Sequence, residues 1–553
     1  MTQIRSVAAL ASRCLAPAGG WLLGLALAAC SSDTSLPVEP ACNPLGAGRC
    51  MTPWPSSAFE VDDPASATGR RLAIPEATLP ANADAAATDP AGWNVADGFS
   101  PTAPMVMAWK GGVSSEGLVP PGHAERSLAA DSATVILDMT TGARVAHAAA
   151  LDPAAIDQPD SQALILQPAA RLVPGHRYAV GITNRVHARD GGELAVPPGF
   201  AALRDHKNTD HELLEAIRPR FADVLAALDT AGVPAGDLVV AWDFTVASDE
   251  LLHRDLASAR DRALAALAAH PSELSITSDA PIDDGKRIRR RITGTLTAPL
   301  FLTQRGAAAL GTTIGRDDAG LPALQGSYPV PFTAIVPACA YSAAEPVGIV
   351  IHGHALFGRA DEAASAPQQA AAAERCAVII GTELRGLSEI DLPAVVRMLD
   401  DITTADDAMD VLEQGLINHV ALVRALRSGL ADPLFVDPAK PSRSLVDPAK
   451  LVYDGGAQPG RLPAIVAGYE PSVPRLATEP LATASGAPGP AIDAASDPAA
   501  ALGATSYAAL LDRSGDGPQF RKIIAAAYPD PLDAVMALGL LQMRWDRIDA
   551  IGL

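Results

Sequence analysis

The sequence is poor in basic and aromatic residues. Its 553 residues include 42 Lys and Arg against 63 Asp and Glu, a formal net charge of −21, and only 4% are aromatic. This acidity argues against binding to nucleic acid or anionic lipid, because both need a basic face. Hydrophobic residues make up 48% of the chain and charged residues 19%, a composition typical of folded cores rather than disorder. At roughly 150 residues per domain, the length predicts more than one domain.

Residues 1–30 have the pattern of an export signal. Arg5 and Arg13 supply positive charge, and the apolar run 21–29 is too short to span a bilayer. This run ends in Leu-Ala-Ala before Cys30, which resembles the lipobox of bacterial lipoproteins. The resemblance implies that Cys30 is acylated and anchors the protein in outer-membrane lipid, with Ser31 matching the outer-membrane sorting class. Which membrane face it occupies stays open, and the alternative is an ordinary cleaved signal.

No pair of cysteines has the C-x-x-C spacing of a metal site. After Cys14 leaves with the signal and Cys30 takes lipid, an even number remains, which in an oxidising compartment predicts two disulfides. The first pair is Cys42 with Cys50, on either side of a Pro-Leu-Gly-Ala-Gly turn. The second is Cys339 with Cys376, each beside an apolar strand.

The mature chain divides into four segments of different composition. We predict a tether and irregular segment over 31–119, because Pro, Ala, Gly and Asp dominate there without periodicity. Short apolar runs with turn signals over 120–205 favour a small Ig-like β-sandwich. A helical connector follows over 206–285. The last domain, 286–553, contains the low-complexity segment 458–503, whose eight prolines exclude a helix or a central strand.

Apolar strands alternate with helices in this last domain. The strands are expected at 347–351, 377–380 and 451–453, with a long amphipathic helix over 404–428 before the third. Such alternation predicts an α/β fold with a mostly parallel sheet that is covered on both faces. The first strand ends in the turn Gly353-His354-Ala355-Leu356-Phe357-Gly358, where a Gly-rich bend lets backbone N–H groups face a developing negative oxygen.

From this turn the chain resembles secreted bacterial α/β-hydrolases of the lipase/esterase kind that carry an Ig-like N-terminal module. The matching motifs, in order, are Trp54-Pro55-Ser56, Ala241-Trp242-Asp243-Phe244-Thr245, Pro299-Leu300-Phe301-Leu302, the His354 turn, Gly386-Leu387-Ser388 and 447–451. The resemblance implies ester hydrolysis without a cofactor, an ester or lipid ligand, and an oxyanion loop at His354, Ala355 and Leu356. Ala355 stands where the pattern prefers Gly.

Two other interpretations of the His354 turn remain. His352 and His354 are alternate strand residues and face one side, as a metal pair would, but only Asp361 and Glu362 lie close in sequence to complete a site. We therefore predict no metal, and a purely structural turn is the remaining alternative.

The catalytic residues of this fold are missing from the expected places. The strand 451–453 leads into Asp454-Gly455-Gly456-Ala457, so that Ala457 occupies the nucleophile position of G-x-S-x-G. No Ser in the chain has Gly at both flanking second positions, and residues 420–553 contain no His. A methyl group cannot attack a carbonyl, so the sequence predicts little or no hydrolysis.

Two hypotheses explain this loss. Either the reading frame is shifted across 458–503 and the C-terminal part is cut short, or the protein is a true pseudoenzyme. The functional hypotheses are a cell-envelope lipoprotein resembling a serine ester hydrolase that is inactive as written, a non-catalytic surface binding lipoprotein, and a metal-dependent hydrolase, in that order.

Overall fold

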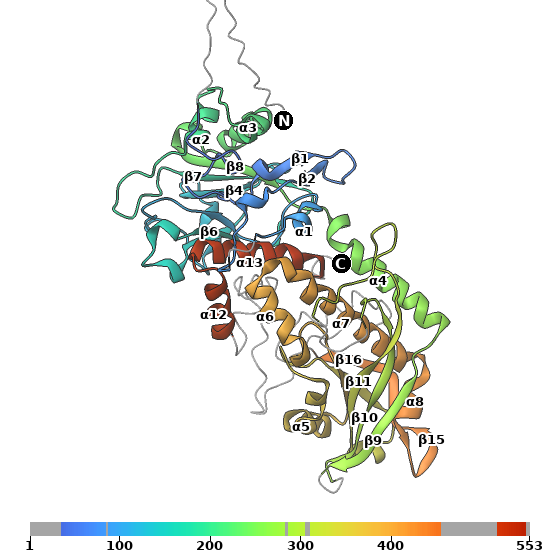
Figure 1. Ribbon diagram of the computed structural model, residues 1–553. Coiled ribbons are helices and arrows are strands. Elements are labelled where there is room, and N and C mark those ends of the chain that lie inside the picture. The colour runs from blue at the N-terminus through green and yellow to red at the C-terminus, as the bar shows by residue number, and fades with distance from the viewer. Residues whose placement is uncertain (1–34, 85–86, 283–285, 305–309, 455–516, 549–553) are drawn as a thin grey trace, which may run out of the picture.

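The computed structural model describes residues 35–84, 87–282, 286–304, 310–454 and 517–548. Residues 35–248, the N-terminal half, carry small antiparallel sheets, and residues 274–454, the α/β half, carry one sheet of six strands (Figure 1). Helix α4 (Asp249–Ala269) connects the two halves. The mixed helix and sheet content, with a six-stranded mixed sheet, is consistent with the predicted α/β class.

Two three-stranded antiparallel sheets form the core of the N-terminal half. One has the order β3 (Met105–Met107), β6 (Leu164–Pro168), β5 (His147–Leu151), and the other has the order β4 (Thr134–Asp138), β7 (Arg177–Thr183), β8 (Leu238–Thr245). A separate hairpin joins β1 (Glu60–Asp62) to β2 (Arg70–Leu72). Because β3 precedes and β8 follows the predicted range 120–205, that range is too short: β8 pairs with β7 along its whole length.

The predicted connector 206–285 also needs correction. The helices of this half are α1 (Ala91–Asn94), α2 (Pro198–Arg204) and α3 (Glu212–Thr230). The apolar face of α3, which includes Phe221 and Val224, is buried against the N-terminal half. Residues 206–237 therefore form an insertion between two adjacent strands, and β9 (Leu274–Ile282) already belongs to the six-stranded sheet.

The six-stranded sheet is less parallel than predicted. Its order is β16 (Val446–Asp454), β12 (Val347–His352), β13 (Val378–Thr382), β11 (Gly326–Pro337), β10 (Ile288–Leu300), β9. Only β12 pairs in parallel, with β13 and β16. The other three pairings are antiparallel, because β9, β10 and β11 follow one another without crossover helices. The expectation of a mostly parallel sheet is thus wrong for the described residues, although the three predicted apolar strands are β12, β13 and β16.

Helices cover this sheet. They are α5 (Ala366–Arg375), α6 (Leu392–Asp400), α7 (Ala405–Ala425) and α8 (Ala431–Leu434), and a small hairpin joins β14 (Val436–Asp437) to β15 (Lys440–Ser444). The expected helix over 404–428 is α7, followed by a π-helical turn at Leu426–Leu430. Almost every residue of α7 is buried, so it is the central helix of the α/β half.

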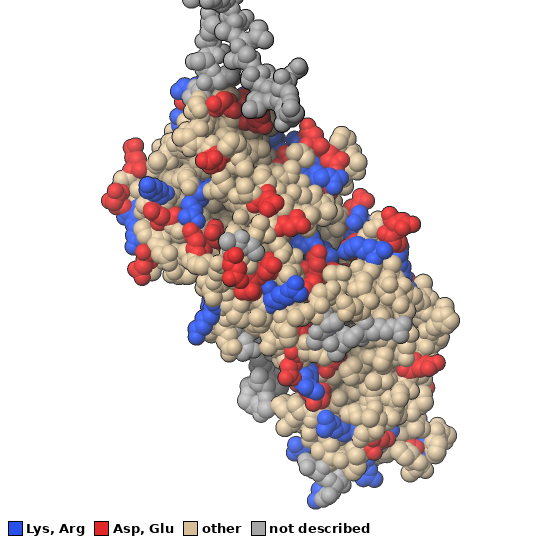
Figure 2. Space-filling view, in the orientation of Figure 1, with Lys and Arg blue, Asp and Glu red and all other residues tan. Residues whose placement is uncertain are grey.

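Helices α12 (Gly517–Ala527) and α13 (Pro531–Trp545) lie at the junction between the two halves (Figure 1). The indole of Trp93 donates to the carbonyl of Leu540 at 2.9 Å, and the N–H of Ile402 donates to the hydroxyl of Tyr528 at 3.2 Å. Acidic and basic side chains are intermixed along this junction (Figure 2). Within the described residues no single helix has the length and apolarity of a membrane span; the pair 517–527 and 531–548, bent by 113°, meets that criterion only when taken together.

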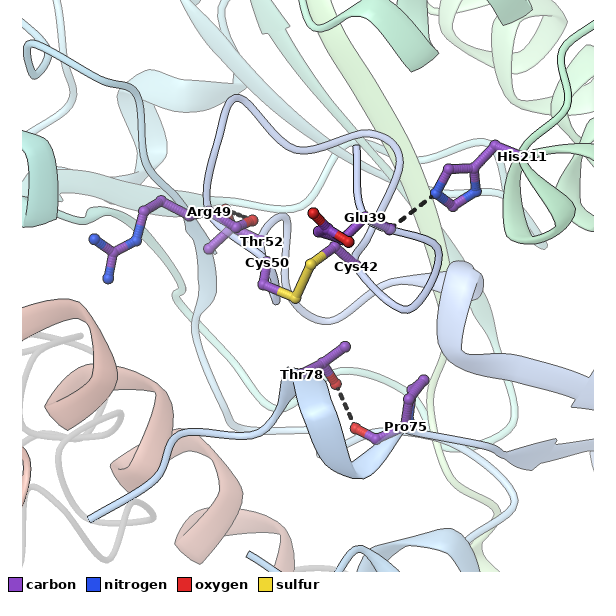
Figure 3. The surroundings of a disulfide bond; sticks show 8 residues. All are labelled: Glu39, Cys42, Arg49, Cys50, Thr52, Pro75, Thr78 and His211. Carbon is purple, nitrogen blue, oxygen red and sulfur yellow. Dashed lines mark hydrogen bonds between the residues drawn. A yellow bond between two sulfur atoms is a disulfide. The ribbon is translucent and has the colours of Figure 1, made fainter. Parts of the chain in front are cut away.

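Both cysteine pairs form disulfides in the structure. Cys42 is bonded to Cys50, close to the segment in which His211 Nε2 approaches the carbonyl of Glu39 at 3.2 Å (Figure 3). Cys339, after β11, is bonded to Cys376, at the end of α5. The second bond joins two segments that flank the strands β12 and β13.

Candidate functional site

The carboxyl ends of β12, β13 and β16 meet at one edge of the sheet. His352 is in register with Gly381 on one side and Asp454 on the other. Parallel strands direct the loops that follow them to the same edge, where α/β proteins bind ligands. We therefore take this edge as the candidate site.

The loop after β12 is closed by its own hydrogen bonds. The N–H of Ala355 donates to Glu362 Oε2 at 2.9 Å, and the N–H of Phe357 donates to the carbonyl of Leu387 at 2.7 Å. In the described part of the chain, the N–H of Leu356 makes no hydrogen bond. Of the predicted oxyanion donors, Ala355 is thus occupied by a carboxylate and Leu356 is open.

His354 connects this loop to the loop after β13. Its Nε2 accepts from the N–H of Leu384 at 2.9 Å, while Nδ1 lies 2.8 Å from the carbonyl of Ala355. Since Nε2 accepts, Nδ1 must carry the proton, and the imidazole is neutral. Both ring nitrogens are engaged and the side chain is buried. His354 therefore has a structural role here and offers no lone pair to a metal or a substrate.

A buried carboxylate organises the loop after β13. Asp391 is ion-paired with Arg385 at 2.9 Å. It also accepts from the N–H of Gly386 and the hydroxyl of Ser388, both at 2.6 Å. The hydroxyl of Ser388 donates to a carboxylate without an intervening histidine, so it isn't activated as a nucleophile.

Two glycines let this loop lie directly on α7. A Cβ on Gly386 would come within 2.5 Å of Leu412 Cα, and a Cβ on Gly415 within 2.4 Å of the Arg385 carbonyl oxygen. Gly386 also has φ of 82°, a conformation that glycine adopts without strain. These close contacts fix the distance between the loop and α7.

Replacement of Gly386 by alanine is expected to lower the free energy of unfolding by about 2–3 kcal/mol, because contact and backbone strain add. Gly122→Ala is the matched control: Gly122 has φ of 86° with nothing within 4 Å of its Cβ position. Thermal unfolding of both variants measures the difference. Equal losses would show that the contact with α7 contributes nothing.

His419 lies on α7 behind this edge. Its ring centroid is 5.8 Å from that of Tyr453 near the end of β16, and its Nδ1 is 3.0 Å from the carbonyl of Gly415. Burial lowers the pKa of His419 to about 4. A histidine that resists protonation so strongly is a poor general base at neutral pH.

A cavity of about 620 Å³, here called the edge cavity, opens beside the β13 loop. Its lining includes Tyr328, Pro331, Arg359, Glu383, Arg385 and Asn418. The Tyr328 hydroxyl donates to Asn418 Oδ1 at 3.0 Å, whereas Asn418 Nδ2 has no hydrogen-bond partner in the described residues. The edge cavity thus combines apolar walls with charged groups of both signs.

Several predicted residues lie outside the described part of the chain. These are Cys30 with the whole signal segment, the nucleophile position Ala457, and the low-complexity segment 458–503. Within the described ranges no group of three or more His, Cys, Asp or Glu side chains is arranged to hold a metal ion. Asp361 and Glu362 do not join His352 and His354, because Glu362 binds the Ala355 N–H and Asp361 lies 3.7 Å from Arg359.

Three residues of this site, Asp391, Gly415 and Asn418, are not predicted by any sequence pattern. Gly415 acts through Arg385 and Asn418 through Tyr328, each on another element, so no local pattern marks them. Asp391 binds Arg385, Gly386 and Ser388 of its own loop, and no motif in the sequence indicates that this carboxylate is buried. The one signal in the sequence is the presence of polar residues within the otherwise apolar helix 404–428.

Comparison with known proteins gives weak structural resemblance and no match to a known family. No family model matches the chain, and no curated protein matches it. Among solved structures, an acetyl xylan esterase from Paenibacillus sp. R4, a hydrolase, matches at 14% identity and a TM-score of 0.20. The match covers 39% of this chain and 56% of that one, so the chain spans little more than half of the neighbour. At this TM-score the resemblance carries no argument about the site.

Proposed function

We propose that the protein is a cell-envelope lipoprotein related to serine ester hydrolases that does not turn over esters as written. The order of sequence motifs supports the relationship, with an Ig-like module in the N-terminal half and an α/β-hydrolase-like domain after it. The single observation that carries the inactivity is the state of the histidines at the sheet edge. His354 has both nitrogens engaged, and His419 is fully buried with a pKa of about 4.

The second candidate is a non-catalytic binding protein for an ester or lipid ligand. The edge cavity favours it, because its volume of about 620 Å³ is within the range of small-molecule sites and its lining combines apolar with charged side chains. A metal-dependent hydrolase ranks third, since the nitrogens of His354 are already used within the described fold.

The purified protein is expected to show no serine-esterase turnover of short-chain aryl esters and no labelling by a fluorophosphonate probe. A base that cannot take the serine proton leaves at most the weak rate that oxyanion donors alone provide. Mass spectrometry after labelling, with an active serine esterase as the positive control, measures the outcome. Stoichiometric labelling of any Ser would overturn the proposal.

Replacement of Cys30 by alanine is expected to move the protein from the outer-membrane fraction to the soluble fraction. Several acyl chains on one residue give stable anchoring, and without the thiol none can be attached. Fractionation of both forms, with mass analysis of the mature N-terminus, tests this. Cys14→Ala, within the same signal, should leave the distribution unchanged. A wild-type protein that is soluble and unmodified at Cys30 would contradict the lipoprotein assignment.

A further inference from the structure

A second cavity, of about 460 Å³, lies at the junction between the two halves. It is here called the junction cavity. Four separate stretches of chain build it: residues 91–100, 247–255, 316–320 and 543–547, with Asp406 of α7 beside them. It shares no lining residue with the edge cavity, so it is a separate site.

Charged groups of both signs form its polar wall. Asp255 Oδ2 is 2.7 Å from Arg316 and 4.0 Å from Arg547, and Asp255 Oδ1 is 3.7 Å from Arg254. Asp255 Oδ1 and Arg547 Nε are both buried, and neither has a hydrogen-bond partner in the described structure. The wall therefore holds one unsatisfied acceptor and one unsatisfied donor.

Apolar side chains also line the junction cavity. Trp93 is 3% exposed, Phe99 1% and Leu252 5%, and Met543 is partly buried beside them. The indole N–H of Trp93 is already bonded to Leu540, so the ring presents only an apolar surface. A cavity between protein halves with an apolar wall and a few convergent polar groups is the usual form of a small-molecule site.

We propose that the junction cavity binds a small zwitterion with an apolar side chain, such as a hydrophobic α-amino acid. Its ammonium group would donate to Asp255 Oδ1, and its carboxylate would accept from Arg547 Nε. The side chain would pack against Trp93 and Phe99. A simple anion satisfies only the arginine and a simple amine only the aspartate, so the pairing of unsatisfied groups favours a ligand that carries both charges.

Calorimetric titration of the full chain with three probes tests the proposal. L-phenylalanine carries both charges, 3-phenylpropanoate lacks the ammonium group, and 2-phenylethylamine lacks the carboxylate. We expect L-phenylalanine to bind at least about tenfold more tightly than either of the others. Equal affinity for the three probes, or no binding of L-phenylalanine, would overturn the proposal.

Two variants locate the binding. Leu251→Trp fills the cavity from a partly exposed helix position and should weaken L-phenylalanine binding by at least about tenfold. Asp255→Asn should remove the preference for the ammonium group. Glu116→Gln, at an exposed position in neither cavity, is the control and should leave the affinity for L-phenylalanine unchanged. If Asp255→Asn does not fold, Leu251→Trp alone decides: unchanged affinity in a variant with an unchanged melting temperature contradicts the site.

Discussion

Replacement of Arg547 by methionine is expected to lower the free energy of unfolding by about 3–5 kcal/mol, because it leaves the buried carboxylate of Asp410 without its counter-ion. Arg547 Nη2 is 3.1 Å from Asp406 and forms a closer ion pair with Asp410, whose side chain is only 4% exposed. Arg544 binds Asp406 but not Asp410 in the described residues, so it does not replace the lost charge. Chemical denaturation of wild type and variant measures the loss.

Two further variants separate charge from side-chain volume. Arg126→Met at an exposed position should change stability by no more than about 0.5 kcal/mol. Asp410→Asn keeps the acceptor oxygen for the N–H of Ile314 and removes the charge, so the double variant Arg547→Met/Asp410→Asn should recover part of the loss. A double variant as unstable as the sum of its parts would show that the ion pair is not the cause.

The helix α7 shows which features of this fold can be predicted from the sequence and which cannot. Its apolar spacing predicts the helix and its place before β16, and the structure confirms both. The spacing doesn't predict that the polar face is buried as well. At Asp410 that burial depends on Arg547, which lies more than 130 residues away and docks from the C-terminal helices.

The candidate site, too, can be predicted only in part from the sequence. An apolar strand that ends in a Gly/His turn predicts the loop after β12 and its place at the sheet edge. The sequence does not indicate that Glu362 occupies the N–H of Ala355, or that His354 is fixed by Leu384. Both contacts depend on how closely the loop after β13 lies against α7. The glycines at 386 and 415 allow that close packing.

Replacement of Glu413 by glutamine is expected to make the protein more stable than wild type at pH 8 and to leave the two nearly equal near pH 4.5. Burial raises the pKa of Glu413 from 4.5 to about 8, with Asp410 and Asp255 adding to the shift and Arg547 and Arg316 opposing it. Between pH 4.5 and about 8, Glu413 therefore keeps its proton in the folded protein and loses it in the unfolded chain. The native state binds more protons in this window, so stability falls as pH rises, by up to about 1.4 kcal/mol per pH unit.

The difference between the two proteins isolates Glu413 from the other titrating groups. Asp407 lies on the same helix, and its pKa is also raised by burial, so the total pH dependence of the wild type is not specific. Glutamine has the same shape as glutamate and no charge. The free energy of unfolding of Glu413→Gln minus that of the wild type should therefore grow steadily from pH 4.5 to about 8 and then stay constant, reaching on the order of 4 kcal/mol. Asp407→Asn is the control, and its difference from the wild type should be smaller, because the side chain of Asp407 is less deeply buried and is paired with Arg397 at 3.3 Å. A Glu413→Gln curve parallel to that of the wild type would mean that Glu413 is ionised in the fold, in which case Arg547 compensates its charge fully.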